Sequence, residues 1–286
     1  MTGLLPLDQT LVWYMSPDGR IVHLSGEPLA GSDGVWLGPD PDGLGSAEVE
    51  SLFEAAARQS GETWIGTKMG HGTIDLQLYV EAESADAFRR RWLWLSNLIE
   101  RRRPGWLLAY TSATGWRWLA VRKESFKPAL GRDPGPRNWA TFDLLLIVES
   151  PLAREADDTD EWNNAAGSGR GDLYLYPGDS EWPSWPQFVL RGPGRFRLRW
   201  AGSDVEFPML RSDEWALVNT DEARPTIRAR DINGVDRNLW PEMKPGTKIE
   251  HPLPPREVSR VDVKVTGGSS QSSAWGTVAV QREGLV

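Results

Sequence analysis

Three histidines are the residues in this sequence best suited to acid–base or metal chemistry. His23, His71 and His251 lie far apart, and none belongs to a spaced His/Glu or His/Asp ligand motif. A metal site or catalytic triad would need three distant segments to converge. Cysteine is absent, which excludes thiolate nucleophiles, disulfides and cysteine metal sites. The spacing therefore favours isolated surface or loop histidines.

Two short segments resemble functional motifs but lack required residues. Asp40-Pro-Asp-Gly43 starts like a calcium loop, yet Leu44 and Ser51 occupy later ligand positions, so an EF-hand is excluded. Gly178-Asp-Ser180 matches the nucleophile segment of one esterase class. That class also needs an aspartate two residues before a late histidine, and Lys248-Ile-Glu precedes His251. We interpret both matches as coincidental.

The segment from Ser150 to Gly171 is acidic and rich in glycine. Its carboxylates, Asp157 to Glu161, lack the shaped cleft that catalytic carboxylates need. Gly167, Gly169 and Gly171 follow no predicted strand and begin no predicted helix, so a phosphate-binding loop is not supported. The sequence predicts a linker here and no catalytic residue, cofactor site or metal site.

Tryptophan is unusually abundant, with 16 residues against 7 phenylalanines and 5 tyrosines. Such rings occur in cores, at interfaces and on sugar-stacking faces. Trp182 and Trp185 lie in a segment that prolines hold extended, where they would either stack on a sugar or cap the end of a β-sandwich. The candidate carbohydrate or partner contacts are Trp182, Trp185, Trp215 and Trp240.

Arginine outnumbers lysine 26 to 6 and forms two triplets. We expect both triplets on one helix, with the later one opposing the negative end of the helix dipole. Solvation is the ordinary role for such side chains, and the alternative is pairing with acidic patches of a neighbouring subunit. The candidate interface residues are Arg89, Arg90, Arg91, Arg101, Arg102 and Arg103.

Composition limits the classes of partner. The 286 residues carry a net charge of −8, which offers no overall attraction to a phosphate backbone, so nucleic acid is not an expected partner. No apolar run reaches the ~18 residues of a membrane span, and we expect neither membrane insertion nor a secretory signal. The length favours two domains of modest size.

Many short apolar runs separated by glycine and proline predict a mainly β protein. Two helices are expected, a weaker one from Ser46 to about Gln59 with Ser46 as N-cap, and a stronger one from Ser84 to about Arg103. In the stronger helix one apolar face contains Phe88, Trp92, Leu95 and Ile99. Strands are expected at 73–80, 106–110, 116–121, 139–149, 172–176, 187–191, 195–200, 215–219, 226–230, 258–266 and 275–281.

These elements predict three segments. Residues 1–149 form a β-sandwich-like domain with one long helix, and residues 150–171 form the linker. Residues 172–286 form a second β-sandwich or a jelly roll. The fold class is therefore mainly β (α+β).

Several segments together resemble the distal tail proteins of long-tailed phages (siphoviruses). They are Ser84-Ala-Asp-Ala-Phe-Arg89 followed by a helix and hairpin, Tyr176-Pro-Gly-Asp179, Trp185 to Gly192, Ala229 to Trp240, and Pro252-Leu-Pro-Pro255 before Val261–Gly267. The spacing carries the likeness, and Arg256 stands where a glycine would often follow the prolines.

The resemblance implies a non-enzymatic minor tail protein at the virion tail tip. The N-terminal domain would form a homo-oligomeric ring, a hexamer by analogy with the family, that joins the tail tube protein to tip, hub or baseplate proteins. The C-terminal sandwich, residues 172–286, would be galectin-like or carbohydrate-module-like and would support host attachment. Two alternatives remain: a glycan-binding module on an assembly domain that contacts a host cell-surface glycan, and an enzyme acting on cell-wall polymer.

Overall fold

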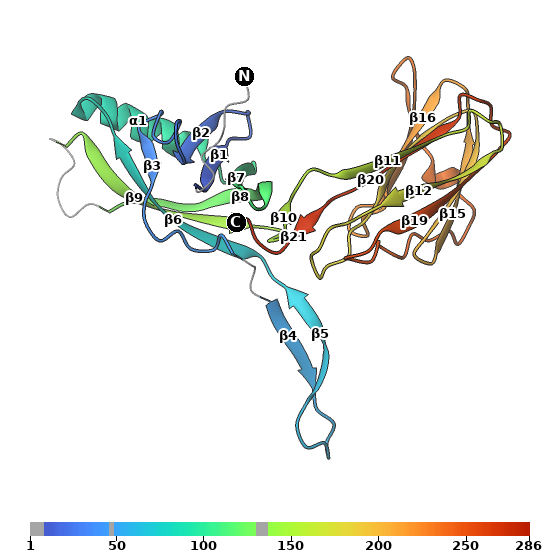
Figure 1. Cartoon of the computed structure of the whole chain (residues 1–286), viewed down its shortest axis with the longest axis horizontal. Helices are drawn as coiled ribbons and strands as arrows, with labels where there is room; N and C mark the ends of the chain where they lie inside the picture. Colours follow the sequence, from blue (N-terminus) through green and yellow to red (C-terminus); the bar gives the residue numbers. More distant parts are fainter. Residues whose placement is uncertain (1–8, 46–48, 130–136) are drawn as a thin grey trace. The chain divides into compact units, whose positions relative to one another are not determined.

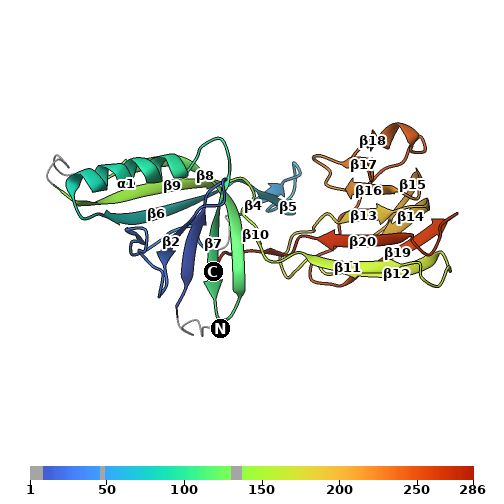
Figure 2. The ribbon, with the colours of Figure 1, turned by 90° about the horizontal axis from the view of Figure 1, so that it is seen from above.

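The computed structural model describes residues 9–45, 49–129 and 137–286. The chain divides into two compact units, one of Met1–Arg154 with Glu283–Val286 and the other of Glu155–Arg282. Both consist mainly of antiparallel strands (Figures 1 and 2). The predicted mainly β fold with one long helix is confirmed for the described part of the chain.

An antiparallel sheet forms the framework of the first unit. In β6, Ile74, Leu76, Leu78 and Val80 are buried and alternate with more exposed residues, as the sequence predicts. The strands lie in the order β2 (Ile21–Ser25), β1 (Leu11–Met15), β7 (Gly105–Thr111), β8 (Gly115–Pro128), β9 (Trp139–Val148), β6 (Gly72–Glu81) and β3 (Val35–Leu37), and β10 (Ala153–Arg154) also pairs with β8.

Helix α1 (Ala85–Leu98) packs on one face of this sheet (Figure 2). Ser84 is its N-cap, and the Ser84 hydroxyl accepts a hydrogen bond from the Ala87 amide at 3.2 Å. Phe88 and Leu95 are 1% exposed, and Trp92 packs partly against the same core. The predicted apolar face is confirmed.

The helix ends five residues before the predicted end at Arg103. Ile99 is the C-cap and has extended backbone angles, and the Glu100 carbonyl accepts the backbone amide of Lys123 in β8 at 2.9 Å. The chain after Leu98 therefore forms a hydrogen bond with β8 instead of continuing the helix by another turn. The expectation that Arg101 to Arg103 oppose the helix dipole is wrong: the Lys123 ammonium donates to the Ser96 carbonyl in the last turn instead.

The weaker predicted helix is also wrong. Residues 49–54 form β4 (Val49–Glu54), which pairs with β5 (Thr63–Met69) as a separate two-stranded hairpin. The proposed N-cap Ser46 lies outside the described residues. Strand pairing overrides the helical tendency because the segment 63–69, rich in β-forming residues, provides a partner for every residue of β4.

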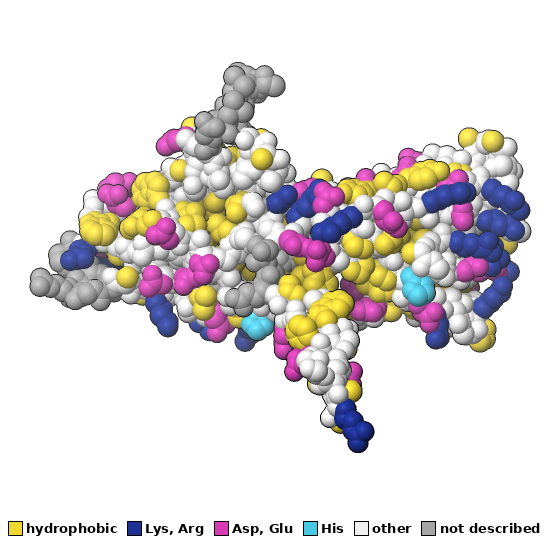
Figure 3. Space-filling model, turned by 60° about the horizontal axis from the view of Figure 1, so that its bottom comes forward, with side chains coloured by type: hydrophobic (Ala, Val, Ile, Leu, Met, Phe, Trp, Pro, Cys, Tyr) yellow, Lys and Arg dark blue, Asp and Glu magenta, His cyan; other side chains and the backbone are white. Residues whose placement is uncertain are grey.

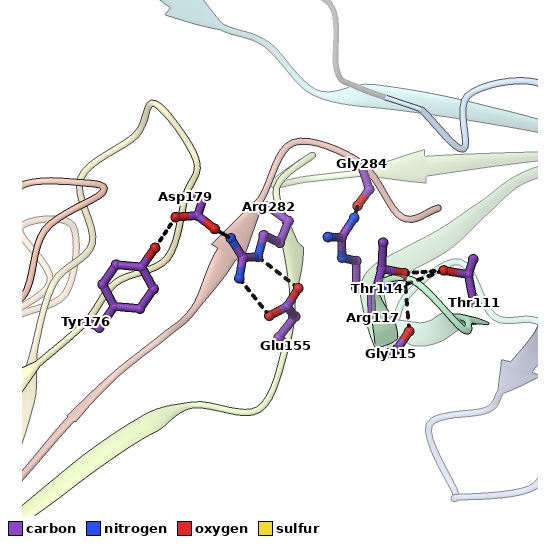
Figure 4. A network of polar contacts seen from close by, with 9 residues as sticks. All are labelled: Thr111, Thr114, Gly115, Arg117, Glu155, Tyr176, Asp179, Arg282 and Gly284. Carbon is purple, nitrogen blue, oxygen red and sulfur yellow. Dashed lines mark hydrogen bonds and ion pairs between the residues drawn. The ribbon is translucent and has the colours of Figure 1, made fainter.

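The predicted hairpin between β7 and β8 is confirmed. Gly115 has φ 74°, a conformation that favours glycine, and the Thr114 amide donates to the Thr111 hydroxyl at 3.0 Å (Figure 4). In the same unit, the Arg117 guanidinium donates to the Gly284 carbonyl at 3.1 Å. This contact attaches the end of the chain to the sheet of the first unit.

The second unit is a sandwich of two antiparallel sheets around one core, as predicted. Phe188, Phe196 and Phe207 are at most 1% exposed and come from both sheets. One sheet has the order β11 (Asp158–Asn163), β20 (Ser273–Val278), β13 (Gln187–Arg191), β16 (Glu214–Asn219), β17 (Thr226–Asp231) and β18 (Asp236–Asn238). The other has the order β12 (Arg170–Leu175), β19 (Ser259–Thr266), β14 (Gly194–Trp200) and β15 (Ser203–Leu210); η1 (Trp240–Glu242) and β21 (Gln281–Arg282) lie outside both orders.

The segment 150–171, expected to be a linker, contains β10, β11 and the start of β12. Its acidic residues have structural partners. Asp158 accepts the Tyr176 amide at 2.7 Å, and Asp160 accepts the Tyr174 amide at 2.8 Å. Carboxylates that bind backbone amides stabilise an ordered strand without burying apolar surface, which composition alone does not reveal.

Arg256 follows the predicted closing prolines and has φ 63°, the left-handed conformation that usually favours glycine. Its backbone amide donates to the Gly178 carbonyl at 2.9 Å, and its guanidinium donates to the Asp179 carbonyl at 3.1 Å. These contacts offset the conformational cost. The loop therefore keeps a glycine-like backbone with an arginine in place.

Candidate functional site

The hairpin of β4 and β5 carries large exposed apolar side chains. The two strands pair only with each other among the described strands. Phe53 lies directly opposite Trp64, and these side chains are 54% and 57% exposed. Figure 3 shows hydrophobic side chains along this arm. Because a lone two-stranded hairpin is at best marginally stable in water, this hairpin is a candidate surface for contact with another protein.

A β-bulge concentrates apolar surface at this point of the hairpin. The register shifts between Leu52 and Phe53, so Ile65 has no residue opposite it and is 57% exposed. The sequence reasoning missed this surface. Two short apolar pairs, Leu52-Phe53 and Trp64-Ile65, separated by polar residues and glycine, are the signal that could have found it.

An aromatic pocket of about 550 Å³ lies on the first unit's sheet, lined by Trp36, Tyr79, Val80, Glu81 and Trp139. Trp36 lies opposite Tyr79 across β3 and β6, and Glu81 lies opposite Trp139 across β6 and β9. Trp139 is 49% exposed. Strand β3 is the last strand of the sheet order, so the pocket lies at one end of that order.

The predicted interface arginines lie in two places. Arg89 and Arg91 are on α1; Arg89 pairs with Asp86 at 3.0 Å, and Arg91 donates to the Glu81 carbonyl. Arg90 is exposed on the same helix, and Arg101 and Arg102 are exposed after it. Arg103 binds the carboxylates of Asp18 and Glu100, and it holds the pKa of the Glu100 carboxyl below its usual value. Arg89 and Arg103 therefore already pair with carboxylates of the first unit.

The four predicted tryptophans do not form one platform. Trp182, Trp185 and Trp240 are half-buried, whereas Trp215 is 39% exposed on β16. Among the described rings, Trp215 stacks on Trp275 instead, with ring centroids 5.6 Å apart. The Arg191 guanidinium lies 5.0 Å from the Trp215 ring centroid. The predicted set thus contains one exposed ring, and the sequence reasoning missed its stacking partner.

One histidine does lie near a serine and an aspartate. His23 Nδ1 is 3.4 Å from the Ser32 hydroxyl and 3.8 Å from Asp33 Oδ2. In a catalytic triad the serine and the acid contact different ring nitrogens, within about 2.6–3.2 Å. Here both approach the same nitrogen at longer distance. The arrangement therefore does not form a catalytic triad.

His71 is exposed, and the backbone amide of His251 donates to the Ser203 hydroxyl at 3.3 Å. Across residues 9–45, 49–129 and 137–286, no group of three or more His, Cys, Asp or Glu side chains is arranged to hold a metal ion. Within the same ranges, no helix is long and apolar enough to cross a membrane.

No protein-family model matches the chain, and a search of curated proteins finds no match. Solved structures do match. The SPP1 Dit protein, described as a paradigm of the hub adsorption apparatus in phages that infect Gram-positive hosts, is 14% identical with a TM-score of 0.62. The match covers 94% of this chain and 98% of that chain.

A second match is a chain of the phage P2 baseplate in its activated conformation with calcium. It is 12% identical, with a TM-score of 0.54, and covers 96% of this chain and 98% of that chain. A chain of the same baseplate with strontium is 13% identical, with the same TM-score of 0.54 and the same coverage. This chain therefore has the fold of SPP1 Dit over nearly its whole length.

Proposed function

We propose that this chain is a distal tail protein: a structural, non-enzymatic component of a phage tail tip. The shared fold with SPP1 Dit, whose description names a hub adsorption apparatus, and with a baseplate chain supports this role. The observation that carries the proposal is the exposed apolar hairpin, with Phe53 and Trp64 each more than half exposed. Such a surface suits permanent contact with another protein better than contact with water.

The neighbour of the hairpin is a second copy of this chain. In one copy, Phe53 and Trp64 pack against the pocket of Trp36, Tyr79 and Trp139 on the next copy. The two surfaces are different parts of the first unit, so the contact is head-to-tail and produces a ring when the rotation closes. Aromatic side chains at the centre of such a contact supply most of the binding energy.

The ring joins the tail tube protein to tip or hub proteins, with the second unit supporting host attachment. This places the chain in the virion, at the tail tip. Six copies are the expected number by analogy with the phage family that the sequence resembles. The role needs no cofactor and no nucleic acid.

Native mass spectrometry of the purified chain tests the ring. Six subunits of 32.0 kDa have a mass of about 192 kDa. We expect this species for the wild type and monomer for the double variant Phe53→Ser/Trp64→Ser. The matched control is Ile21→Ser/Leu93→Ser, which removes two exposed apolar side chains elsewhere in the first unit, and it should retain the ring. A wild type that stays monomeric both alone and on isolated tail tubes contradicts the proposal.

A glycan-binding module is the second candidate, favoured by the exposed apolar face of the second unit. Leu217 is 50% exposed and Trp215 39% exposed, and Trp215 stacks on Trp275. A glycan array with the wild type, Trp215→Ala and Trp182→Ala tests this function. Binding that Trp215→Ala alone abolishes supports it, and absence of binding to any host cell-wall sugar contradicts it.

A further inference from the structure

The outer face of the four-stranded sheet in the second unit carries a row of positive charges. Arg170 of β12 lies directly opposite Lys264 of β19, and Lys264 lies directly opposite Arg197 of β14. Directly opposite side chains have Cβ atoms about 5 Å apart, so the Cβ atoms of these three residues lie within about 10 Å. Like charges at this spacing repel one another and are destabilising unless something neutralises them.

The acidic residues on this face are already occupied. Asp204 binds Arg197 at 2.5 Å and Arg199 at 3.0 Å. Arg260 joins Asp172 and Asp262, at 2.9 Å to each. Glu206 accepts Lys244 at 2.9 Å and Arg195 at 3.5 Å, so it too is neutralised.

Arg170 and Lys264 have no carboxylate partner in the described part of the chain, and both are exposed. The surface around them is concave, a groove of about 520 Å³. Its charged lining consists of Arg170, Arg197, Arg199, Arg260 and Lys264 against Asp172 and Asp262. On a chain with a net charge of −8, this is a local excess of positive charge, and Figure 3 shows Lys and Arg side chains gathered on the second unit.

We propose that this groove, which we call the basic groove, binds a flexible phosphodiester polymer that has no bases. Guanidinium and ammonium groups bind phosphate oxygens well, and Arg170 and Lys264, on neighbouring strands and without a carboxylate partner among the described residues, can contact successive phosphates of one polymer. The lining contains no aromatic side chain on which a base would stack, which favours a polymer without bases over a single-stranded nucleic acid. The site goes beyond ring assembly, which involves only the first unit.

Isothermal titration calorimetry of the full chain with synthetic poly(glycerol phosphate) tests the proposal, with polyethylene glycol as the uncharged control. We expect binding at low salt that weakens as salt is added. The variant Arg170→Gln/Lys264→Gln should lower the affinity about tenfold or more, because two charge-assisted contacts are lost. The slope of log affinity against log salt should fall by about 1.4, the value for two phosphate contacts on a single strand.

The control variant Arg224→Gln/Arg228→Gln removes two positive charges elsewhere in the second unit and should retain the wild-type affinity. No binding by the wild type, or equal loss in both variants, overturns the proposal. Tighter binding of single-stranded DNA through Arg170 and Lys264 overturns the choice of a polymer without bases. Self-association at low salt that Arg170→Gln/Lys264→Gln abolishes assigns the groove to a second copy of the chain instead.

Discussion

Arg282 and Glu155 form a bidentate ion pair between the last and first residues of the second unit. Arg282 Nε donates to Glu155 Oε1 at 2.8 Å, and Nη2 donates to Oε2 at 3.1 Å (Figure 4). The two side chains are only 19% and 20% exposed. Arg282 also binds Asp179, which accepts the hydroxyl of Tyr176. The pair therefore fastens the two ends of the sandwich to each other and to the loop after β12.

Glu155→Gln should destabilise the second unit by about 1–2 kcal/mol, because it leaves a largely buried guanidinium with a weaker acceptor. Urea unfolding followed by tryptophan fluorescence measures this change. The control is Glu250→Gln, which removes the ion pair between Lys248 and Glu250. Their side chains are 71% and 51% exposed, respectively. That change should alter stability by less than about 0.5 kcal/mol. Equal losses in the two variants would contradict a structural role for the Arg282–Glu155 pair.

Asp179 should make the second unit sensitive to acid. The Tyr176 hydroxyl and then the Arg282 guanidinium donate to Asp179 and hold its pKa below the usual value. A carboxyl with a lowered folded-state pKa stabilises the fold when ionised. This contribution is fully present above about pH 4, the range of the unfolded pKa, and is lost as the pH falls through the folded-state pKa.

The variant Asp179→Asn should therefore show a smaller fall in Tm between neutral pH and pH 3 than the wild type. Differential scanning calorimetry across this range measures the difference. Asp213→Asn is the matched control, since Asp213 is exposed and forms no ion pair with any described residue, and its Tm profile should follow that of the wild type. A profile for Asp179→Asn that is parallel to the wild-type profile would refute the coupling.

Period-two alternation and turn chemistry made most of the sandwich predictable. Strand β13, for example, has the predicted bounds, Gln187–Arg191, because its buried residues alternate with more exposed ones. Strand β11 was missed because its carboxylates bind the amides of Tyr174 and Tyr176, a tertiary contact that composition does not encode. Arg256 was noticed as a departure in sequence, but only its φ of 63° shows that the backbone conformation is retained.

The candidate surfaces were less predictable than the fold. Trp215 stays a predicted contact residue that lies exposed on β16. Its stacking on Trp275, 60 residues later in the sequence, depends on β16 and β20 both pairing with β13. The sequence pattern predicts a helix at Phe53, and a helix gives no indication that Phe53 lies opposite Trp64. Which side chains meet on such a surface depends on which strands pair and in what register. Local sequence patterns do not determine that pairing.

Two glycines with the same backbone conformation should respond differently to substitution. Gly43 and Gly19 both have φ 81°, so an alanine at either position has the left-handed cost of about 1–2 kcal/mol. An added Cβ at Gly43 would lie 2.2 Å from the Thr73 carbonyl oxygen, whereas one at Gly19 would meet nothing within 4 Å. Gly43→Ala should therefore be less stable than Gly19→Ala by about 1–3 kcal/mol in urea unfolding. Equal stabilities would show that β6 shifts freely at Thr73.

Two phenylalanines in the first unit distinguish its core from its assembly surface. Phe142 is fully buried and stacks on Phe126 with ring centroids 4.8 Å apart, whereas Phe53 is 54% exposed on the hairpin. Phe142→Ala should destabilise the monomer by about 3–5 kcal/mol, because it leaves a cavity beneath α1. Phe53→Ala should change monomer stability by less than about 0.5 kcal/mol.

Urea unfolding of both variants at concentrations where the chain is monomeric makes this comparison, with the transition of the first unit analysed separately from that of the second. If Phe53→Ala were as destabilising as Phe142→Ala, the hairpin would be packed against its own chain in solution. The hairpin would then not be free to bind a neighbouring copy. If the Phe53→Ala monomer is stable but no longer assembles, Phe53 contributes to the free energy of association between copies and not to the stability of the monomer. The proposed ring requires this result.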